Sequence, residues 1–183
     1  PLDAVGDREG CTWVDETTVT TPAGFKEAWQ LFTESGWQGL AFPEAYGGQA
    51  LPVSLALVQG EMIATACWSW GMFAGLSKGC INTLLAHGSD DLKAKYLPPL
   101  VAGEFTGTMC LTEPQCGSDL AQVSTKAEPQ ADGSYRVSGT KIFISAGDHD
   151  MTENIVHTVL ARTPAGADKG VKGISLFLVP KFK

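Results

Sequence analysis

Hydrophobic positions follow a helical period over the first hundred residues. A helix start at Thr20–Pro22 and an end at Ser35–Gly36 enclose apolar side chains that recur every three to four residues. These are Phe25, Ala28, Trp29 and Phe32. The spacing predicts one amphipathic helix there. The following stretch 36–52, rich in glycine and proline, predicts an irregular connector.

Three more helices are expected before residue 104. The alanine- and leucine-rich stretches 53–74 and 79–86 predict two of them, with Gly88 as the C-terminal cap of the second. Ser89 is a suitable N-cap for the third, which we expect Pro98 and Pro99 to end, because proline lacks the amide that a helix needs.

After Gly103 the pattern changes from helical to alternating. The alternation predicts a strand over 105–112, with two faces. One face carries Thr106, Thr108, Cys110 and Thr112, and the other carries Phe105, Met109 and Leu111. Further strands are expected at 122–127, 134–137, 141–145, 155–162 and 173–179, with a hairpin turn at Asp132-Gly133. Helices first and strands second indicate an α+β chain with segregated halves.

Composition and charge narrow the class of protein. The 183 residues carry 13 basic and 20 acidic side chains, a net charge of −7, and 44% are hydrophobic. The excess of acid lies entirely before residue 105. This balance disfavours binding to nucleic acid or to an anionic membrane surface. The apolar stretch 63–76 is too short for a membrane span.

The cysteines and the first residues bear on the compartment. Five cysteines without a C-x-x-C pair indicate reduced thiols in the cytoplasm rather than a disulfide framework. The acidic start of the chain does not resemble a signal or transit peptide.

Common catalytic signatures are absent from the sequence. There is no G-x-x-x-x-G-K-[ST], G-x-G-x-x-G, G-x-S-x-G or H-E-x-x-H motif. The run Asp148-His149-Asp150 is a weak metal candidate, because neighbouring positions on an extended chain point apart, and a solvated turn is the expected alternative. We therefore assign no metal site and no catalytic residue.

Two segments suit an aromatic cofactor with an anionic arm. In MCLTEPQCGSDL, from Met109, a strand ends at Thr112, and Gly117-Ser118 offers backbone amides and a hydroxyl to a pyrophosphate. In GTKIFISAG, from Gly139, an extended strand would place Phe143 and Ser145 on one face, beside a planar ring. Each segment taken alone is equally compatible with ordinary strand ends, turns and core packing.

Five stretches, taken in order, resemble the acyl-CoA dehydrogenase family. They are GWQGLAFPEAYGG, HGSDDLKAKYLPPLVAGE, CLTEPQCGSD, GTKIFISAG and GISLFLVPK. The resemblance implies an N-terminal all-helical domain over 1–104 and a flavin-contacting, antiparallel β-barrel-like domain over 105–183. It also implies FAD as cofactor, an acyl-CoA thioester as substrate, electron-transfer flavoprotein or a similar acceptor, and a homo-oligomer. Phe143 and the GDHD sequence that follows Ala146 resemble the bacterial methylmercaptopropionyl-CoA and long-chain branch.

The resemblance also assigns roles to seven positions. Met109, Leu111 and Thr112 correspond to the strand that hydrogen-bonds the pyrimidine side of the flavin. Gly117 and Ser118 correspond to the turn at the pyrophosphate, where Ser118 also borders the acyl-CoA groove. Phe143 stands where the family often has Trp against the isoalloxazine, and Ser145 where it often has Thr near flavin N5.

The catalytic carboxylate of the family lies in a C-terminal helical domain, so we expect it beyond Lys183 and these residues alone to be inactive. Glu44 and Glu113 are expected to be structural rather than catalytic. Two alternatives to an oxidoreductase stay open: a non-catalytic acyl-CoA-binding, flavin-binding or stress-response relative, and a plain interaction domain without ligand.

Overall fold

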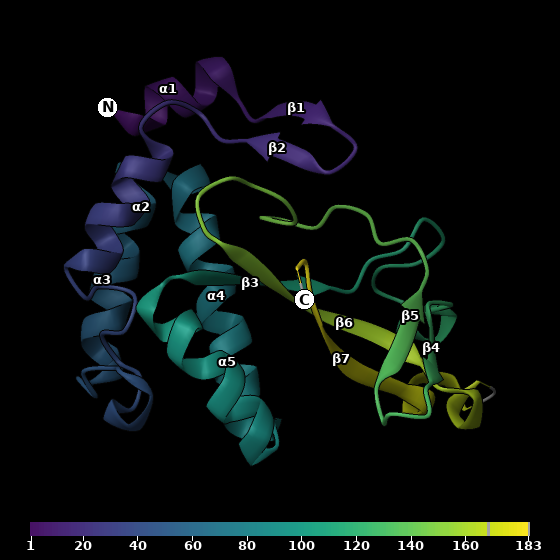
Figure 1. Ribbon diagram of the computed structural model, residues 1–183. Coiled ribbons are helices and arrows are strands. Elements are labelled where there is room, and N and C mark those ends of the chain that lie inside the picture. The colour runs from purple at the N-terminus through teal and green to yellow at the C-terminus, as the bar shows by residue number, and fades with distance from the viewer. Residues whose placement is uncertain (168, 183) are drawn as a thin grey trace.

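The computed structural model describes residues 1–167 and 169–182 and places helices on one side and a sheet on the other (Figure 1). The helices are α1 Leu2–Glu9, α2 Phe25–Glu34, α3 Val53–Ala66, α4 Trp68–His87 and α5 Asp90–Ala102. The strands are β1 Thr12–Asp15, β2 Thr18–Thr20, β3 Phe105–Cys110, β4 Lys126–Pro129, β5 Tyr135–Ser138, β6 Asn154–Arg162 and β7 Ile174–Pro180. Short 3₁₀ turns are η1 Glu44–Tyr46, η2 Leu120–Gln122, η3 Pro164–Gly166 and η4 Gly170–Gly173.

The helix predicted from the aromatic spacing near residue 25 is confirmed as α2. Its residues Phe25, Trp29 and Phe32 are buried, and they pack against Trp70 and Phe73 of α4. The rings of Trp29 and Trp70 lie 6.0 Å apart, and the Trp29 indole donates to the carbonyl of Gly103 at 2.9 Å. This aromatic cluster fixes α2 on α4 and ties both to the start of β3.

Helix α5 confirms the predicted Ser89 cap but not the predicted end. The Ser89 hydroxyl accepts from the amide of Leu92, and the helix then continues through Pro98 and Pro99 to Ala102. Leu97 and Leu100 are fully buried in one cluster with Ile81 and Leu84 of α4. The two carbonyls that the prolines leave without an amide belong to exposed residues, Ala94 and Lys95, where water can bind them. Core packing therefore outweighs the local effect of the prolines.

The predicted boundary between the two middle helices was also wrong. We expected the break between residues 74 and 79, but α3 ends at Ala66 and α4 begins at Trp68. The extended Cys67 between them donates its amide to Ile63 and is buried in the aromatic cluster. The break therefore follows from packing at Cys67 and not from a glycine or proline.

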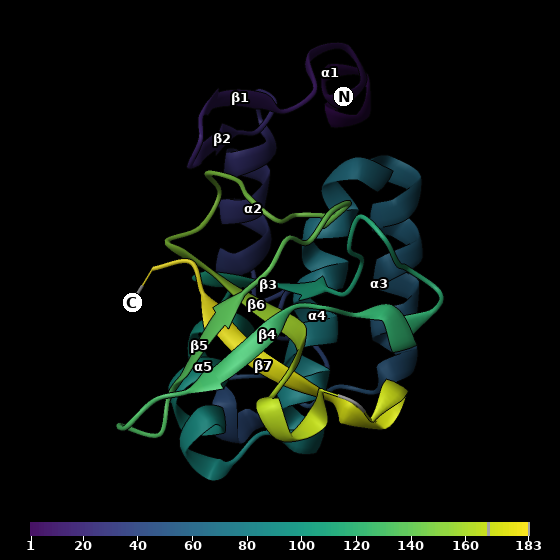
Figure 2. The same cartoon turned by 90° about the vertical axis from the view of Figure 1, so that its right-hand side faces the viewer.

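The sheet is mixed and not antiparallel as predicted, and among the described residues its strands do not close into a barrel, so the predicted barrel-like form is not confirmed. Strands follow the order β3-β6-β4-β5, and β7 also pairs with β6. β6 runs parallel to β3 and, through one residue pair, to β4, while β7 and β5 pair in antiparallel fashion with their neighbours. Figure 2 shows β3 beside α4, at the inner end of the sheet. The Asp132-Gly133 hairpin is confirmed, with Gly133 at a φ of 83°.

Two further expectations about secondary structure fail. The N-terminal part is not all-helical, because β1 and β2 form a hairpin whose first strand is exposed throughout. Residues 141–145 form no strand, and Phe143 has a left-handed backbone with a φ of 56°. The strand predicted over 122–127 is shifted to Lys126–Pro129, whereas those at 155–162 and 173–179 are confirmed to within a residue.

Among the described residues, no helix is long and apolar enough to cross a membrane.

The alternation predicted for 105–112 is confirmed in β3, but the buried face is the polar one. Thr106 and Thr108 are almost fully buried, and their hydroxyls bond His149 at 2.8 Å and His157 at 2.7 Å. On the other face, a Cβ at Gly107 would lie 2.3 Å from the Cβ of Cys80. Glycine thus lets β3 lie directly on α4.

Candidate cofactor-binding site

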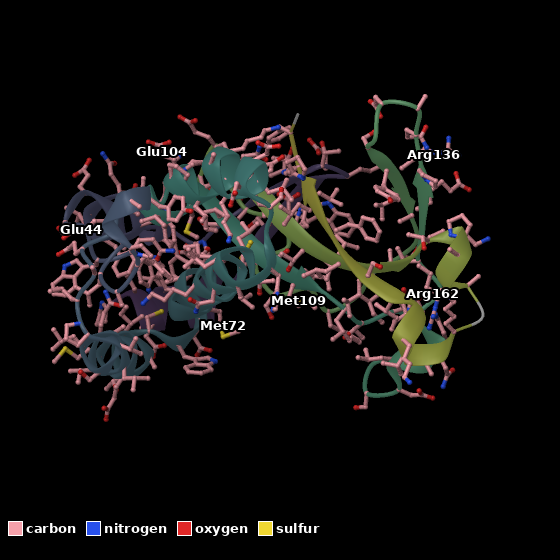
Figure 3. All side chains as sticks on the ribbon, turned by 90° about the horizontal axis from the view of Figure 1, so that it is seen from below. Glu44, Met72, Glu104, Met109, Arg136 and Arg162 are labelled. Atoms are coloured by element: carbon pink, nitrogen blue, oxygen red, sulfur yellow. The ribbon has the colours of Figure 1, made fainter. Side chains whose placement is uncertain are left out.

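Strand β3 has one edge that no other strand of the described residues covers. The amide of Gly107 points to that edge and donates to the hydroxyl of Ser77 on α4 at 3.1 Å. Because alternate residues of a strand point their backbone groups to the same edge, the amide and carbonyl of Met109 and Leu111 also face away from β6. Met109 is 39% exposed, and Figure 3 shows it where the helices meet the sheet. Along this edge the amide of Gly107 and the carbonyl of Leu111 already have partners, so Met109 is where a ligand could reach backbone groups.

A tight turn follows β3 and presents the Gly117-Ser118 pair. Glu113 and Cys116 exchange two backbone hydrogen bonds, of 2.8 and 3.0 Å. Gly117 then lies beside Thr112, since a Cβ on it would stand 3.7 Å from the Thr112 methyl group. Ser118 is exposed. The strand end and the predicted pyrophosphate turn are thus neighbours.

The second predicted segment lies against the first. The amide of Ile142 donates to the carbonyl of Thr112 at 2.9 Å, and the ammonium of Lys141 donates to the carbonyl of Leu111 at 3.0 Å. Phe143 follows directly and is 88% exposed, and Ser145 is exposed as well. The structure therefore brings the Thr112 turn and the Phe143–Ser145 segment together, although through an irregular loop rather than the expected strand.

Glu113 lies where these segments meet and is buried to 2% exposure. Its Oε1 accepts from the amide and hydroxyl of Thr125 and from Lys141, at 3.0, 2.6 and 2.8 Å. Its Oε2 accepts from the amide and hydroxyl of Ser124, at 2.8 and 2.7 Å, and from Gln115. Burial raises the pKa of this carboxyl, but the bonds from Lys141, Thr125 and Ser124 outweigh burial and hold the pKa well below its usual range. Glu113 is therefore a carboxylate at neutral pH.

Two cations near this region were not predicted as important from the sequence. Lys141, whose side chain is 11% exposed, is the ion-pair partner of Glu113. Arg162, at the end of β6, donates to the carbonyls of Leu120, Ala121, Val123, Gly166 and Gly170. Figure 3 shows Arg162 farther out along the sheet than Met109. There was one sequence signal for this ion pair: the first motif segment contains Glu113, and the second contains Lys141.

The Asp148-His149-Asp150 run is a packed corner rather than the expected solvated turn. Asp148 pairs with Lys181, Asp150 accepts from the amide and hydroxyl of Thr21, and His149 is buried against Phe73. The amide of Met151 donates to His149 Nδ1, so Nε2 carries the proton and donates to Thr106. Burial lowers the pKa of His149 to about 4. Each of the three side chains has its own structural partner.

The arrangement suits a planar heterocycle. The β3 edge supplies backbone groups at Met109. The loop that carries the exposed Phe143 bonds the chain just after the strand, at Leu111 and Thr112, and Gly117-Ser118 lies in the turn that follows. A ring with polar atoms along one side can bond such an edge while its face lies against an aromatic side chain. None of the described residues forms a group of three or more His, Cys, Asp and Glu side chains that could hold a metal ion.

The chain matches two adjoining family descriptions. Residues 9–104 match "Acyl-CoA dehydrogenase, N-terminal domain", and residues 108–183 match "Acyl-CoA dehydrogenase, middle domain". Its sequence is 49% identical over 181 residues to 3-methylmercaptopropionyl-CoA dehydrogenase of Ruegeria pomeroyi, covering 99% of this chain and 30% of that protein. It is 38% identical over 185 residues to a butyryl-CoA dehydrogenase of Syntrophomonas wolfei, covering 100% of this chain and 30% of that protein.

Solved structures are similar as well. An acyl-CoA dehydrogenase from Geobacillus kaustophilus aligns with a TM-score of 0.71 and 30% identity, over 84% of this chain and 39% of that chain. An acyl-CoA dehydrogenase complexed with FAD from Bacillus anthracis aligns with a TM-score of 0.71 and 29% identity, over 86% of this chain and 26% of that chain. The chain therefore spans about a third of the length of these relatives.

Proposed function

The chain belongs to the acyl-CoA dehydrogenase family, and we propose that it forms the helical and β portions of an FAD-dependent enzyme that oxidises an acyl-CoA thioester between its α and β carbons. The observation that carries the proposal is the contact between Thr112 and Ile142, which brings the two segments predicted to hold the flavin side by side. We divide the chain into a helical part, 1–104, and a flavin-contacting part, 105–183, in which residues 168 and 183 lie outside the described residues.

The residues of this chain would bind and orient the cofactor rather than move protons. Met109 at the end of β3, with Leu111 and Thr112 just after the strand, would bond the pyrimidine side of the flavin. Gly117 and Ser118 would meet the pyrophosphate, and Ser118 would also border the substrate.

Phe143 would cover the ring and keep water from it, and Ser145 would donate to its edge near N5. Bound FAD would accept a hydride from the β carbon of the substrate.

No carboxylate described here is assigned as the base that removes the α proton. Glu113 accepts six hydrogen bonds and pairs with Lys141, which leaves it no free site for a substrate proton. Glu44 lies in the turn η1, within the glycine-rich connector. The base, in this proposal, comes from a further helical domain, and these 183 residues alone turn nothing over.

Partners and compartment follow from the same proposal. Relatives named after acyl-CoA substrates support an acyl-CoA thioester, and a solved neighbour titled as an electron transferring flavoprotein supports an acceptor of that kind. The five free cysteines support a reducing compartment such as the cytoplasm. We also propose a homo-oligomeric enzyme without contact to nucleic acid, in line with the net charge of −7.

The alternative is a relative that binds flavin or acyl-CoA without dehydrogenation. Titration of this chain with FAD, followed by quenching of flavin fluorescence, separates a binder from an empty scaffold. We expect saturable binding, and its absence would refute the proposal. A dye-reduction assay with acyl-CoAs of several lengths is expected to show no sustained turnover by these residues alone. Sustained turnover would show that the base lies within them.

A further inference from the structure

The side chains of Phe143, Ser118 and Ser145, which are assigned to the flavin, are not fixed by their own packing. Phe143 is 88% exposed, and Ser118 and Ser145 are exposed too, so few side-chain contacts fix them. Phe143 also adopts a left-handed backbone with a φ of 56°, a conformation that is strained for a residue other than glycine. Their positions must therefore be fixed by the backbone segments that carry them.

Those segments meet at one carboxylate. Glu113 directly follows Thr112, and it opens the turn that leads to Gly117 and Ser118. Lys141, two residues before Phe143, bonds both Glu113 and the carbonyl of Leu111. A single buried side chain thus links the end of β3 to the loop that carries the aromatic ring.

A third segment closes the arrangement. The amides and hydroxyls of Ser124 and Thr125, just before β4, all donate to Glu113. Gly139 packs on Thr125, since a Cβ at Gly139 would stand 2.4 Å from the Thr125 hydroxyl. Residues 124 and 125, just before β4, therefore contact the loop 139–145 both directly at Gly139 and through Glu113 and Lys141.

We propose that Glu113 is a positioning residue, whose carboxylate, through Lys141, Ser124 and Thr125, sets the spacing between the Thr112–Ser118 turn and the Phe143–Ser145 loop. The inference rests on the proposed function, because the spacing matters only if both segments hold one flavin. Glu113 acts through these neighbours and does not itself touch the ring. Its charge is needed in this role, because Gln in its place has one acceptor oxygen instead of two and leaves the Lys141 ammonium unpaired.

The test compares Glu113→Gln with a matched control, Glu128→Gln. Glu128 lies on β4 and forms an exposed ion pair with Arg136, so its substitution removes the same charge without touching the site. Two quantities are measured on each folded chain: the dissociation constant for FAD, and hydrogen exchange in peptides that cover 111–118 and 139–145. We expect Glu113→Gln to weaken FAD binding by roughly tenfold or more and to raise exchange in both segments together. Glu128→Gln should change neither.

Each outcome decides one of the two claims. Wild-type exchange in both segments of Glu113→Gln, or unchanged FAD affinity, overturns the positioning role. Failure of the unsubstituted chain to bind FAD refutes the proposed function instead, and exchange alone then decides whether Glu113 couples the segments.

If Glu113→Gln does not fold, Ser124→Ala takes its place, since it removes one hydroxyl donor from the carboxylate. Raised exchange in 139–145, a segment that Ser124 reaches through Glu113, supports the role, and unchanged exchange overturns it.

Discussion

Replacement of Gly107 by alanine should push β3 away from α4. Gly107 lies in the middle of β3, and the added methyl group would stand 2.3 Å from the Cβ of Cys80 and 2.8 Å from its sulfur. Real Cβ atoms do not approach so closely, and Cys80 is itself buried in the cluster that joins α4, α5 and β6. Either the strand or the helix must move.

The expected magnitude follows from the kind of contact. Overpacking of a well-packed core by one methyl group costs about 1–3 kcal/mol. For a chain of this length, each kcal/mol lowers the melting temperature by about 2–4 °C. We therefore expect Gly107→Ala to melt roughly 2–12 °C below the unsubstituted chain. The displacement also moves the amide of Gly107 away from Ser77, so the free edge at Met109 should bind FAD more weakly.

Gly79→Ala is the matched control, because it makes the same chemical change on α4. Nothing lies within 4 Å of a Cβ at Gly79, and alanine is favoured over glycine in a helix interior by about 1 kcal/mol. This variant should melt higher than the unsubstituted chain, by roughly 2–4 °C. Differential scanning calorimetry of both variants provides the measurement. A Gly107→Ala protein as stable as the parent would refute the close approach of β3 to α4.

Three further predictions concern single side chains. Burial lowers the pKa of His149 to about 4, whereas the same side chain in the unfolded protein takes up a proton near pH 6.5. The free energy of unfolding should therefore fall by on the order of 3 kcal/mol as the pH drops from 6.5 to 4, which urea titrations would measure. His149→Gln should flatten that fall, and an unchanged slope would contradict it. Lys141→Met leaves the buried Glu113 carboxylate unpaired and should cost about 3–5 kcal/mol in chemical denaturation, whereas a cost below about 1 kcal/mol would place the pair in solvent. Phe143→Ala should change the free energy of unfolding by no more than about 0.5 kcal/mol, because the ring is 88% exposed. It should nevertheless weaken FAD binding in a fluorescence titration, and an unchanged affinity would show that Phe143 does not contact the cofactor.

Local sequence signals predicted those elements that local forces determine. The aromatic spacing of α2, the alternation of β3 and the Asp132-Gly133 turn each have a cause within a few residues, and the structure confirms all three. The helix through Pro98 and Pro99 has no such local cause, because its stability comes from Leu97 and Leu100, which pack on α4. Sequence rules on proline cannot include such a tertiary gain.

The candidate site shows the same division. Its two segments were predictable as motifs, and the roles that the resemblance gives them around one flavin imply that they lie close together, but not the bond between Thr112 and Ile142. The ion pair that supports the two segments was not predictable, because Glu113 and Lys141 are 28 positions apart in the sequence. The loop conformation at Phe143 also depends on the neighbours of that loop, whereas alternation alone favoured a strand. The positions were thus predictable, and the geometry that joins them was not.

The edge of β3 at Met109, which no other described strand pairs with, has a consequence for handling the protein. An open strand edge is a template on which a second polypeptide can add its own strand, and such addition is a common first step of aggregation. A ring seated along Met109 and Leu111 would cap that template. We therefore expect preparations made with excess riboflavin or FAD to stay dispersed on storage, while flavin-depleted ones form insoluble, β-rich material.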